Sequence, residues 1–262
     1  MTIQRKQFSL RALVTVSLGM LLLAAGVAHA EGVTLPLPAE DQQKINTQLG
    51  ANLVIKALPS KPIDDVSTYF PLQDRAQTYR VTAGPHTGNS QTLGLAKVRR
   101  PGGKMAWRFQ FSPTLAGFIN QTTTGDLMMP SVIDTGEGVV VITTPANPFV
   151  LKGMKPGESR SYSQQVSVIE LGDPSDQEYS GSLKGTYTYV GAYQVKVPAG
   201  TYDTILLRLK CDGKVGPAHT QDAAYYFFSP GVGVVAMISQ EDATAFWIIH
   251  IDTSSGKVLS SP

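Results

Sequence analysis

The sequence predicts an all-β protein, built as a strongly curved antiparallel sheet or open barrel with a short N-terminal helix. The first observation behind this prediction is a hydrophobic period of two, which recurs in short segments from Tyr69 onward. The second is the turn chemistry between these segments, as at Pro156-Gly157 and Pro230-Gly231. The third is that no helical segment separates them, which argues against parallel β-α-β units and favours a sandwich, a barrel or one curved sheet.

The clearest predicted strand covers residues 104–112. Its apolar residues Met105, Trp107, Phe109 and Phe111 alternate with small or polar residues, as in a half-buried strand. Pro101-Gly102-Gly103 is a turn, so this strand is expected to form a hairpin with residues 91–100. Further strands are expected at residues 115–122, 126–133, 138–144, 160–171, 182–190, 192–197, 203–211, 223–229, 232–240 and 244–251.

The N-terminal segment predicts a cleaved secretory signal peptide. Basic residues precede an apolar run from Leu13 to Val27, and Ala28-His29-Ala30 then supplies small residues two apart. The run is shorter than the roughly twenty residues that a spanning helix needs, which argues against the alternative of an uncleaved anchor. We therefore expect a periplasmic or secreted protein with no transmembrane segment after cleavage.

Three parts are expected along the chain: a signal peptide at residues 1–30, a helical lead-in and linker at 31–65, and a single β domain at 66–262. In the lead-in, Glu40 and Asp41 place acidic residues in the first turn of a helix, and Gly50 is a natural stop. Cleavage of 30 of the 262 residues leaves 232, which is enough for one large β domain with a substantial core.

The charge of the mature chain is close to neutral. Cleavage removes three of the 22 Lys and Arg residues and none of the 20 Asp and Glu residues, so the net charge becomes 19 − 20 = −1. A near-neutral surface has no strong long-range field for a polyanion, so nucleic acid is not expected as a partner.

The chain has one cysteine, Cys211, so an intramolecular disulfide is excluded. Strand alternation places it on one face with Ile205, Leu207 and Leu209. This pattern predicts a buried, inert thiol that packs as a small apolar side chain, in preference to a nucleophile.

No catalytic, metal or cofactor motif is found. The histidines of the mature chain, His86, His219 and His250, have no second His or Cys within five residues, so no metal site is predicted. The chain has no G-x-S-x-G elbow, no S-x-x-K and no phosphate loop. We therefore predict no catalytic residues and no cofactor.

Basic residues crowd the predicted turn between residues 91–100 and 104–112. They are Lys97, Arg99, Arg100 and Lys104. A solvated hairpin end that discourages aggregation is the favoured interpretation. The alternative is a docking patch for an anionic surface.

Aromatic side chains are the remaining resource for a site. Their alternation places them on shared strand faces, where packed core is the usual interpretation. The alternative is an apolar pocket enclosed by a curved sheet, with tyrosine hydroxyls to orient a ligand. The ligand-binding residues predicted on that alternative are Trp107, Phe109, Tyr187, Tyr189, Tyr226 and Phe228.

Four stretches have a familiar form: Tyr69-Phe70-Pro71-Leu72 with the following Tyr79-Arg80-Val81; Met154-Lys155-Pro156-Gly157-Glu158; Val197-Pro198-Ala199-Gly200-Thr201-Tyr202-Asp203-Thr204; and Tyr226-Phe227-Phe228-Ser229-Pro230-Gly231-Val232-Gly233-Val234-Val235. Through them the chain resembles a widespread family of uncharacterised bacterial envelope β-domains, from about Tyr69 to Asp252. The resemblance implies a shape similar to the lipoprotein-carrier folds, in which an antiparallel sheet curls around an apolar space. It implies no established activity and no catalytic residues.

Together, these observations favour a non-catalytic periplasmic or secreted protein that binds an apolar or amphipathic envelope component, such as a lipid. One alternative is a hydrolase whose site is assembled from distant residues such as His219 and Asp222. Another is a structural or interaction protein of the envelope, with an exposed apolar patch. The ligand, partner proteins and oligomeric state stay open.

Overall fold

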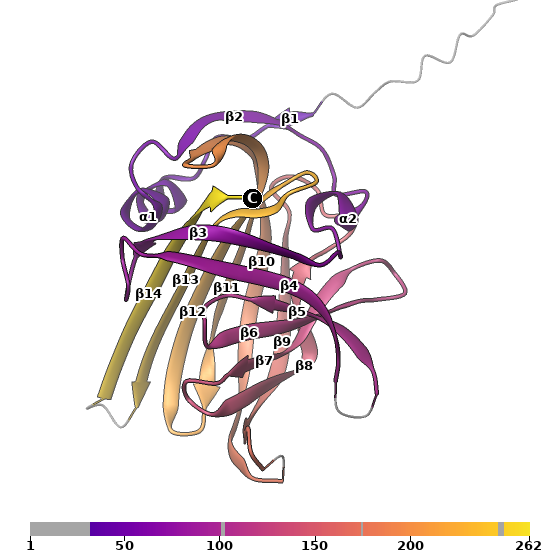
Figure 1. Ribbon diagram of the computed structural model, residues 1–262, viewed down its shortest axis with the longest axis vertical. Coiled ribbons are helices and arrows are strands. Elements are labelled where there is room, and N and C mark those ends of the chain that lie inside the picture. The colour runs from indigo at the N-terminus through magenta and orange to yellow at the C-terminus, as the bar shows by residue number, and fades with distance from the viewer. Residues whose placement is uncertain (1–31, 101–102, 174, 246–248) are drawn as a thin grey trace, which may run out of the picture. The chain divides into compact units, whose positions relative to one another are not determined.

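Twelve antiparallel strands close into a barrel in the computed structural model, which describes residues 32–100, 103–173, 175–245 and 249–262. Around the ring they are β10 (Gln177–Val197), β11 (Gly200–Val215), β12 (Ala218–Ser229), β13 (Gly233–Ala245), β14 (Ile249–Ser261), β3 (Arg75–Ala83), β4 (Ser90–Arg99), β5 (Met105–Gln110), β6 (Leu115–Gln121), β7 (Leu127–Asp134), β8 (Val139–Val150) and β9 (Ser159–Glu170), which pairs with β10. Figure 1 shows the front strands, β3 to β8, crossing those behind at a large angle.

Each strand of the ring pairs with the next one in sequence, and the ring closes where the last strand, β14, pairs with β3. The long strand β10 has two partners on one edge. Its first part, Gln177–Thr188, pairs with β9. Its last part pairs with β2 (Val54–Ser60), which in turn pairs with the short β1 (Val33–Thr34). A bulge between Tyr189 and Gly191 separates the two parts and redirects the strand.

The prediction of an all-β fold with a curved antiparallel sheet is confirmed, and so is the hairpin, which is β4 and β5. Residues 182–190 and 192–197 were expected as two strands, but they form one strand because the chain continues through the bulge. Residues 244–251 were expected as one strand and instead span a reversal, with Ala245 opposite Ile249. The strand β2 was not expected, since its burial does not alternate and it contains Pro59.

The helix α1 (Ala39–Leu49) lies against the outer face of β13, β14 and β3. Ile45 and Leu49 are buried, and the Thr82 hydroxyl donates to the Gln48 carbonyl at 2.6 Å. The outward-facing Leu206 and Phe227 of the neighbouring strands are also fully buried. These strands are therefore covered on both faces.

The second helix, α2 (Val66–Tyr69), is a single turn whose Asp65 cap accepts from the Ser67 backbone N–H at 2.9 Å. It delivers Phe70 into the barrel core, where that side chain is fully buried. Neither described helix is long and apolar enough to cross a membrane. The predicted signal peptide, the turn at Pro101-Gly102 and the side chain of His250 lie outside the described residues.

Candidate functional site

The barrel interior contains a cluster of aromatic rings around Phe149 of β8. Its ring centroid lies 4.9 Å from that of Phe70, 5.5 Å from those of Tyr226 and Phe228, and 6.0 Å from that of Phe109. These residues come from β8, β5, β12 and the segment after α2, which are not neighbours in the ring. They meet across the interior, mostly edge to face, which is a favourable geometry for aromatic pairs.

The six aromatic residues predicted as ligand-binding have different environments. Phe109, Tyr187, Tyr189 and Phe228 are buried, whereas Trp107 and Tyr226 are only partly buried. The Tyr187 hydroxyl donates to the Phe149 carbonyl at 2.5 Å, and the Tyr189 hydroxyl donates to the Lys61 carbonyl at 3.2 Å. Three of the six predicted residues, Phe109, Tyr226 and Phe228, have rings in contact with the ring of Phe149. Among the described residues, Trp107, Tyr187 and Tyr189 are not part of these ring contacts.

Beyond the aromatic cluster, the inward face of the barrel is not fully buried. Phe111, Val132, Leu209 and Tyr226 are only partly buried. Phe111 and Tyr226 face each other across the interior, with ring centroids 6.3 Å apart, and Leu209 lies on the face of Tyr187 in the strand register. These inward-facing side chains therefore keep some solvent exposure.

The partly exposed part of the inward face becomes polar past Tyr226. Asp222 lies opposite Glu241, and Ser239 lies between Glu241 and the aromatic cluster along β13. Burial raises the pKa of both carboxyls, and the negative charge of Asp222 raises that of Glu241 further. The interior therefore has an aromatic part followed by a part with carboxyl and hydroxyl groups.

A buried amine faces the same interior and was not predicted. Lys257 is opposite Met237, which is itself opposite Tyr226, and its ammonium donates to the Ser255 hydroxyl at 3.1 Å. Burial lowers the pKa of Lys257 to about 8. Alternation along residues 253–259 was the available signal, but the predicted strands ended at residue 251, so this residue had no assigned face.

The prediction of a buried Cys211 is wrong, because this residue is only partly buried. It follows the apolar face of Leu207 and Leu209, but its neighbour on β12 is Asp222, whose carboxylate accepts from the thiol at 3.6 Å. Burial raises the pKa of the thiol to about 12, and the Asp222 carboxylate contributes to the same shift. Both effects favour the protonated, unreactive form.

We expect Cys211 in the native protein to react with a thiol reagent far more slowly at pH 8 than a free cysteine does. The raised pKa leaves little thiolate at that pH. Asp222→Asn should increase the labelling rate severalfold by removing a negative charge that opposes thiolate formation. Asp212→Asn, next to the cysteine but on the outer face, is the matched control and should change the rate much less. Labelling followed by mass spectrometry measures this, and rapid labelling of the unmutated protein would contradict it.

The structure does not bring His219 and Asp222 together. His219 is exposed and its Nε2 lies 3.5 Å from Asp212 Oδ2, whereas Asp222 faces the interior and accepts from the Thr220 hydroxyl at 3.1 Å. These residues alternate along β12 and therefore face opposite sides of the sheet. Within the described part of the chain, no group of three or more His, Cys, Asp and Glu side chains is suited to hold a metal ion.

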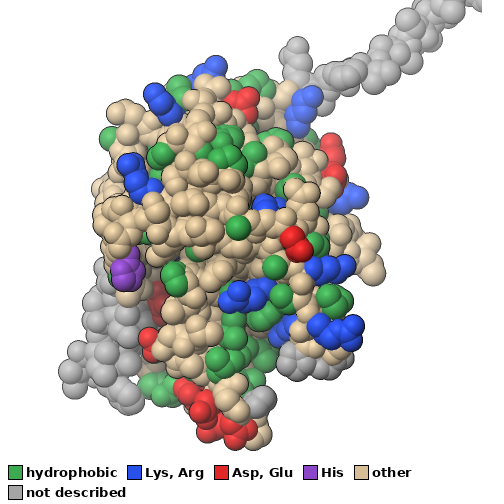
Figure 2. All heavy atoms as spheres, viewed as in Figure 1, with side chains coloured by type: hydrophobic (Ala, Val, Ile, Leu, Met, Phe, Trp, Pro, Cys, Tyr) green, Lys and Arg blue, Asp and Glu red, His purple; other side chains and the backbone are tan. Residues whose placement is uncertain are grey.

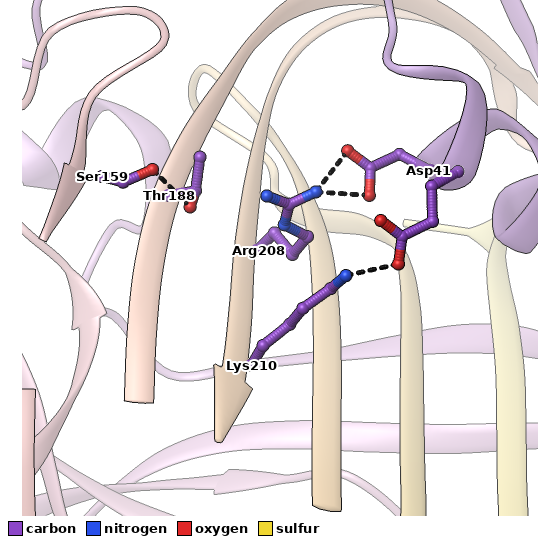
Figure 3. Close-up of polar contacts among 6 residues, drawn as sticks. Asp41, Ser159, Thr188, Arg208 and Lys210 are labelled. Atoms are coloured by element: carbon purple, nitrogen blue, oxygen red, sulfur yellow. Dashed lines mark hydrogen bonds and ion pairs between the residues drawn. The ribbon is translucent and has the colours of Figure 1, made fainter. Parts of the chain in front are cut away.

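A groove of about 780 Å³ lies beside α1 on the outer face of β9 to β13. Figure 3 shows the ion pairs at its edge, where acidic side chains of α1 point toward β11. Arg208 Nη1 lies 2.7 Å from both carboxylate oxygens of Asp41, and Lys210 Nζ lies 2.5 Å from Glu40 Oε1. Because these charges neutralise one another, they fasten the helix and offer little net charge to a ligand.

A second pocket, of about 400 Å³, lies at the β4–β5 hairpin next to Trp107. Its cationic members are Lys97, Arg100 and Lys104, and its apolar members include Leu72, Met105, Ala106 and Ile119. Figure 2 shows Lys and Arg side chains beside hydrophobic ones at the lower right of the face in view. The basic residues of the hairpin turn therefore line the same pocket as Trp107. Of the six residues predicted to bind a ligand, Trp107 is the one that lines this pocket.

No protein-family model and no curated protein sequence matches this chain. Three solved structures are similar to it at low identity. The hypothetical lipoprotein YmcC of Escherichia coli has a TM-score of 0.38 and 9% identity, over 71% of this chain and 86% of that one. A protein assumed to be exported, with a YmcC-like fold, from Bacteroides fragilis has a TM-score of 0.37 and 11% identity, over 77% and 98%. A protein assumed to be a lipoprotein, from Parabacteroides distasonis, has a TM-score of 0.33 and 12% identity, over 74% and 97%.

Two of these neighbours are named as lipoproteins and one as an exported protein. Similarity at this level transfers no activity, ligand or site residue to the chain.

Proposed function

We propose that this chain is a non-catalytic, periplasmic or secreted protein that binds an apolar or amphipathic component of the cell envelope inside its barrel. One observation carries the proposal: side chains that face the inside of a closed ring remain partly exposed, among them Phe111, Leu209 and Tyr226. Small-molecule sites are concave and mostly apolar with a few polar groups. An interior that passes from aromatic rings to Asp222 and Glu241 has this composition.

Polar atoms without partners support the same proposal. The Tyr162 hydroxyl, Gln164 Oε1 and Thr143 Oγ1 are buried and have no hydrogen-bond partner within the described part of the protein. Tyr162 lies over Gly185, where an added Cβ would come within 2.2 Å of the tyrosine ring. Buried polar groups in native proteins are nearly always bonded to protein, water or ligand. These three are therefore groups that neutral polar groups of a ligand can satisfy.

The proposed ligand-binding residues remain Trp107, Phe109, Tyr187, Tyr189, Tyr226 and Phe228. Tyr226 and Trp107 are the partly exposed members and would contact the ligand first. The four buried members form the packed wall behind them, and their tight packing holds the shape of the site.

The test uses the neutral apolar fluorophore N-phenyl-1-naphthylamine, whose emission rises in an apolar site. We expect the unmutated protein to bind it and Leu209→Phe to weaken binding with little change in the thermal midpoint, because Leu209 is only partly buried. Leu207→Phe is the matched control on the same strand face. Leu207 is fully buried, so the larger side chain should overpack the core and cost about 1–3 kcal/mol of unfolding free energy.

Absence of probe binding by the unmutated protein would overturn the binding function. So would equal destabilisation by Leu209→Phe and Leu207→Phe, since it would mean that the interior at Leu209 is packed core. Either result would favour the structural or interaction protein instead.

A further inference from the structure

We propose that the pocket beside Trp107 binds the phosphate group of an amphipathic molecule. The inference rests on the proposed function, because it specifies the headgroup chemistry of the ligand that such a binding protein would take. It starts from three positive charges and an exposed aromatic edge gathered around one pocket of about 400 Å³, a volume typical of small-molecule sites.

The pocket lies at the hairpin end of the β4–β5 pair, and its three cations come from both faces of that pair, because Lys97 and Trp107 alternate with Arg100 and Lys104 along the strands. Lys97 lies opposite Trp107 in the β4–β5 pair, and its ammonium lies 5.9 Å from the centre of the indole ring. At the end of the pair, the Arg100 backbone N–H donates to the Lys104 carbonyl at 2.9 Å, which holds these two residues together. The Arg100 guanidinium stacks over Phe118, 4.5 Å from its ring centre, on the face of the sheet opposite to Ile119, so its orientation is restricted.

None of the ion pairs recorded for the described residues involves these three cations. Those pairs use Arg160, Arg208, Lys210 and His219. Asp74 lies beside the site, but its carboxylate accepts from the backbone N–H of Lys97 at 2.8 Å, not from the ammonium. Within the described structure, the three positive charges therefore lack a carboxylate partner.

The chemistry of the cations selects the ligand group. A guanidinium presents parallel N–H donors that match two phosphate oxygens, and an ammonium adds a compact charge with rotatable donors. One Arg and two Lys side chains around a pocket thus suit a phosphate. The amides of Asn120 and Gln121 line the same pocket and can bond the hydroxyl groups or ester oxygens that accompany a phosphate in a lipid headgroup.

The pocket also has an apolar side, which indicates an amphipathic ligand. Met105 is 47% exposed at the pocket, and Leu72 and the partly buried Trp107 lie beside it. Trp107 shares the inward face of β5 with Phe109 and so leads toward the aromatic cluster. Asp222 lies past Tyr226 along β12, opposite Glu241. The cations beside Trp107 therefore attract an anionic group, and the two carboxylates repel it.

The experiment compares two short-chain lipids below their micelle-forming concentrations: dihexanoyl phosphatidic acid and dihexanoyl phosphatidylcholine. Trp247→Phe leaves Trp107 as the sole tryptophan, so its emission reports binding at the pocket. We expect phosphatidic acid to bind about tenfold more tightly than phosphatidylcholine, and the preference to shrink as salt is raised.

Lys97→Gln combined with Lys104→Gln should remove most of this preference and weaken phosphatidic acid binding about tenfold. Lys152→Gln combined with Lys196→Gln is the control, because it changes the net charge equally at exposed positions outside the pocket. Retention of binding in the control and loss in the pocket variant would support the site.

Inorganic phosphate distinguishes the two sources of the anion. If inorganic phosphate at the same concentration does not displace phosphatidic acid, the result supports a lipid headgroup. If it displaces the lipid equally well, the site binds the free ion, and the lipid part of the proposal is overturned. Equal binding of the two lipids, or unchanged binding in the pocket variant, overturns the phosphate site while leaving the proposed binding function intact. If the unmutated protein binds neither the neutral fluorophore nor either lipid, the proposed function itself is wrong.

Discussion

Asp41→Ala is expected to lower the free energy of unfolding by about 3–5 kcal/mol, the usual loss when one partner of a buried ion pair is removed. The Asp41 side chain is 0% exposed and the Arg208 side chain 20%, and both carboxylate oxygens accept from Arg208 Nη1. Without Asp41, the guanidinium would remain beneath α1 with no charge to balance it. Urea unfolding followed by circular dichroism measures the loss.

The neighbouring ion pair supplies the control for this prediction. Glu40→Ala removes the partner of Lys210 one residue away, but those side chains are 72% and 38% exposed. An exposed pair contributes only about 0.2–1 kcal/mol, so Glu40→Ala should have a small effect. Equal losses in the two variants would show that the Asp41 pair does not fasten the helix by charge burial.

A double variant separates the charge from the packing. Asp41→Leu combined with Arg208→Met replaces the pair with apolar side chains, so no buried charge is left unpaired. We expect it to regain most of the stability that Asp41→Ala loses, since apolar replacements of buried ion pairs are often neutral or stabilising.

Phe149→Ala is expected to destabilise the protein by about 3–5 kcal/mol, as for other large-to-small changes at buried aromatic residues. Phe149 is fully buried, and its ring contacts those of Phe70, Phe109, Tyr226 and Phe228. Its removal therefore opens a cavity that the surrounding rings cannot close. Thermal and urea unfolding should agree on the size of the loss.

Phe111→Ala is the matched control, because Phe111 is only partly buried and contacts two rings, those of Phe109 and Tyr226. It should cost clearly less stability than Phe149→Ala. A loss as large as that of Phe149→Ala would mean that the interior at Phe111 is as tightly packed as the aromatic cluster, and it would remove the main support for the binding function.

The local features of the fold could be predicted from the sequence. The period of two identified the strands from β4 to β9 to within a few residues, apart from the extension of β8 to Val150, because alternation is a property of neighbouring residues. The β4–β5 hairpin followed from its turn chemistry, and acidic residues followed by Gly50 marked the ends of α1. The shared face of Trp107 and Phe109 was likewise readable from their spacing.

The long-range features required the tertiary structure. Alternation assigns a residue to a face, but it does not say which distant strands pair, so the β14–β3 pairing that closes the ring has no local signal. Asp41 has the sequence context of an ordinary exposed first-turn acid, and only the position of Arg208, 167 residues away, makes it a buried partner. The joining of the basic turn to Leu72 in one pocket also needs strand pairing, because the pairing of Arg75 with Leu95 brings the residues before β3 beside the end of β4.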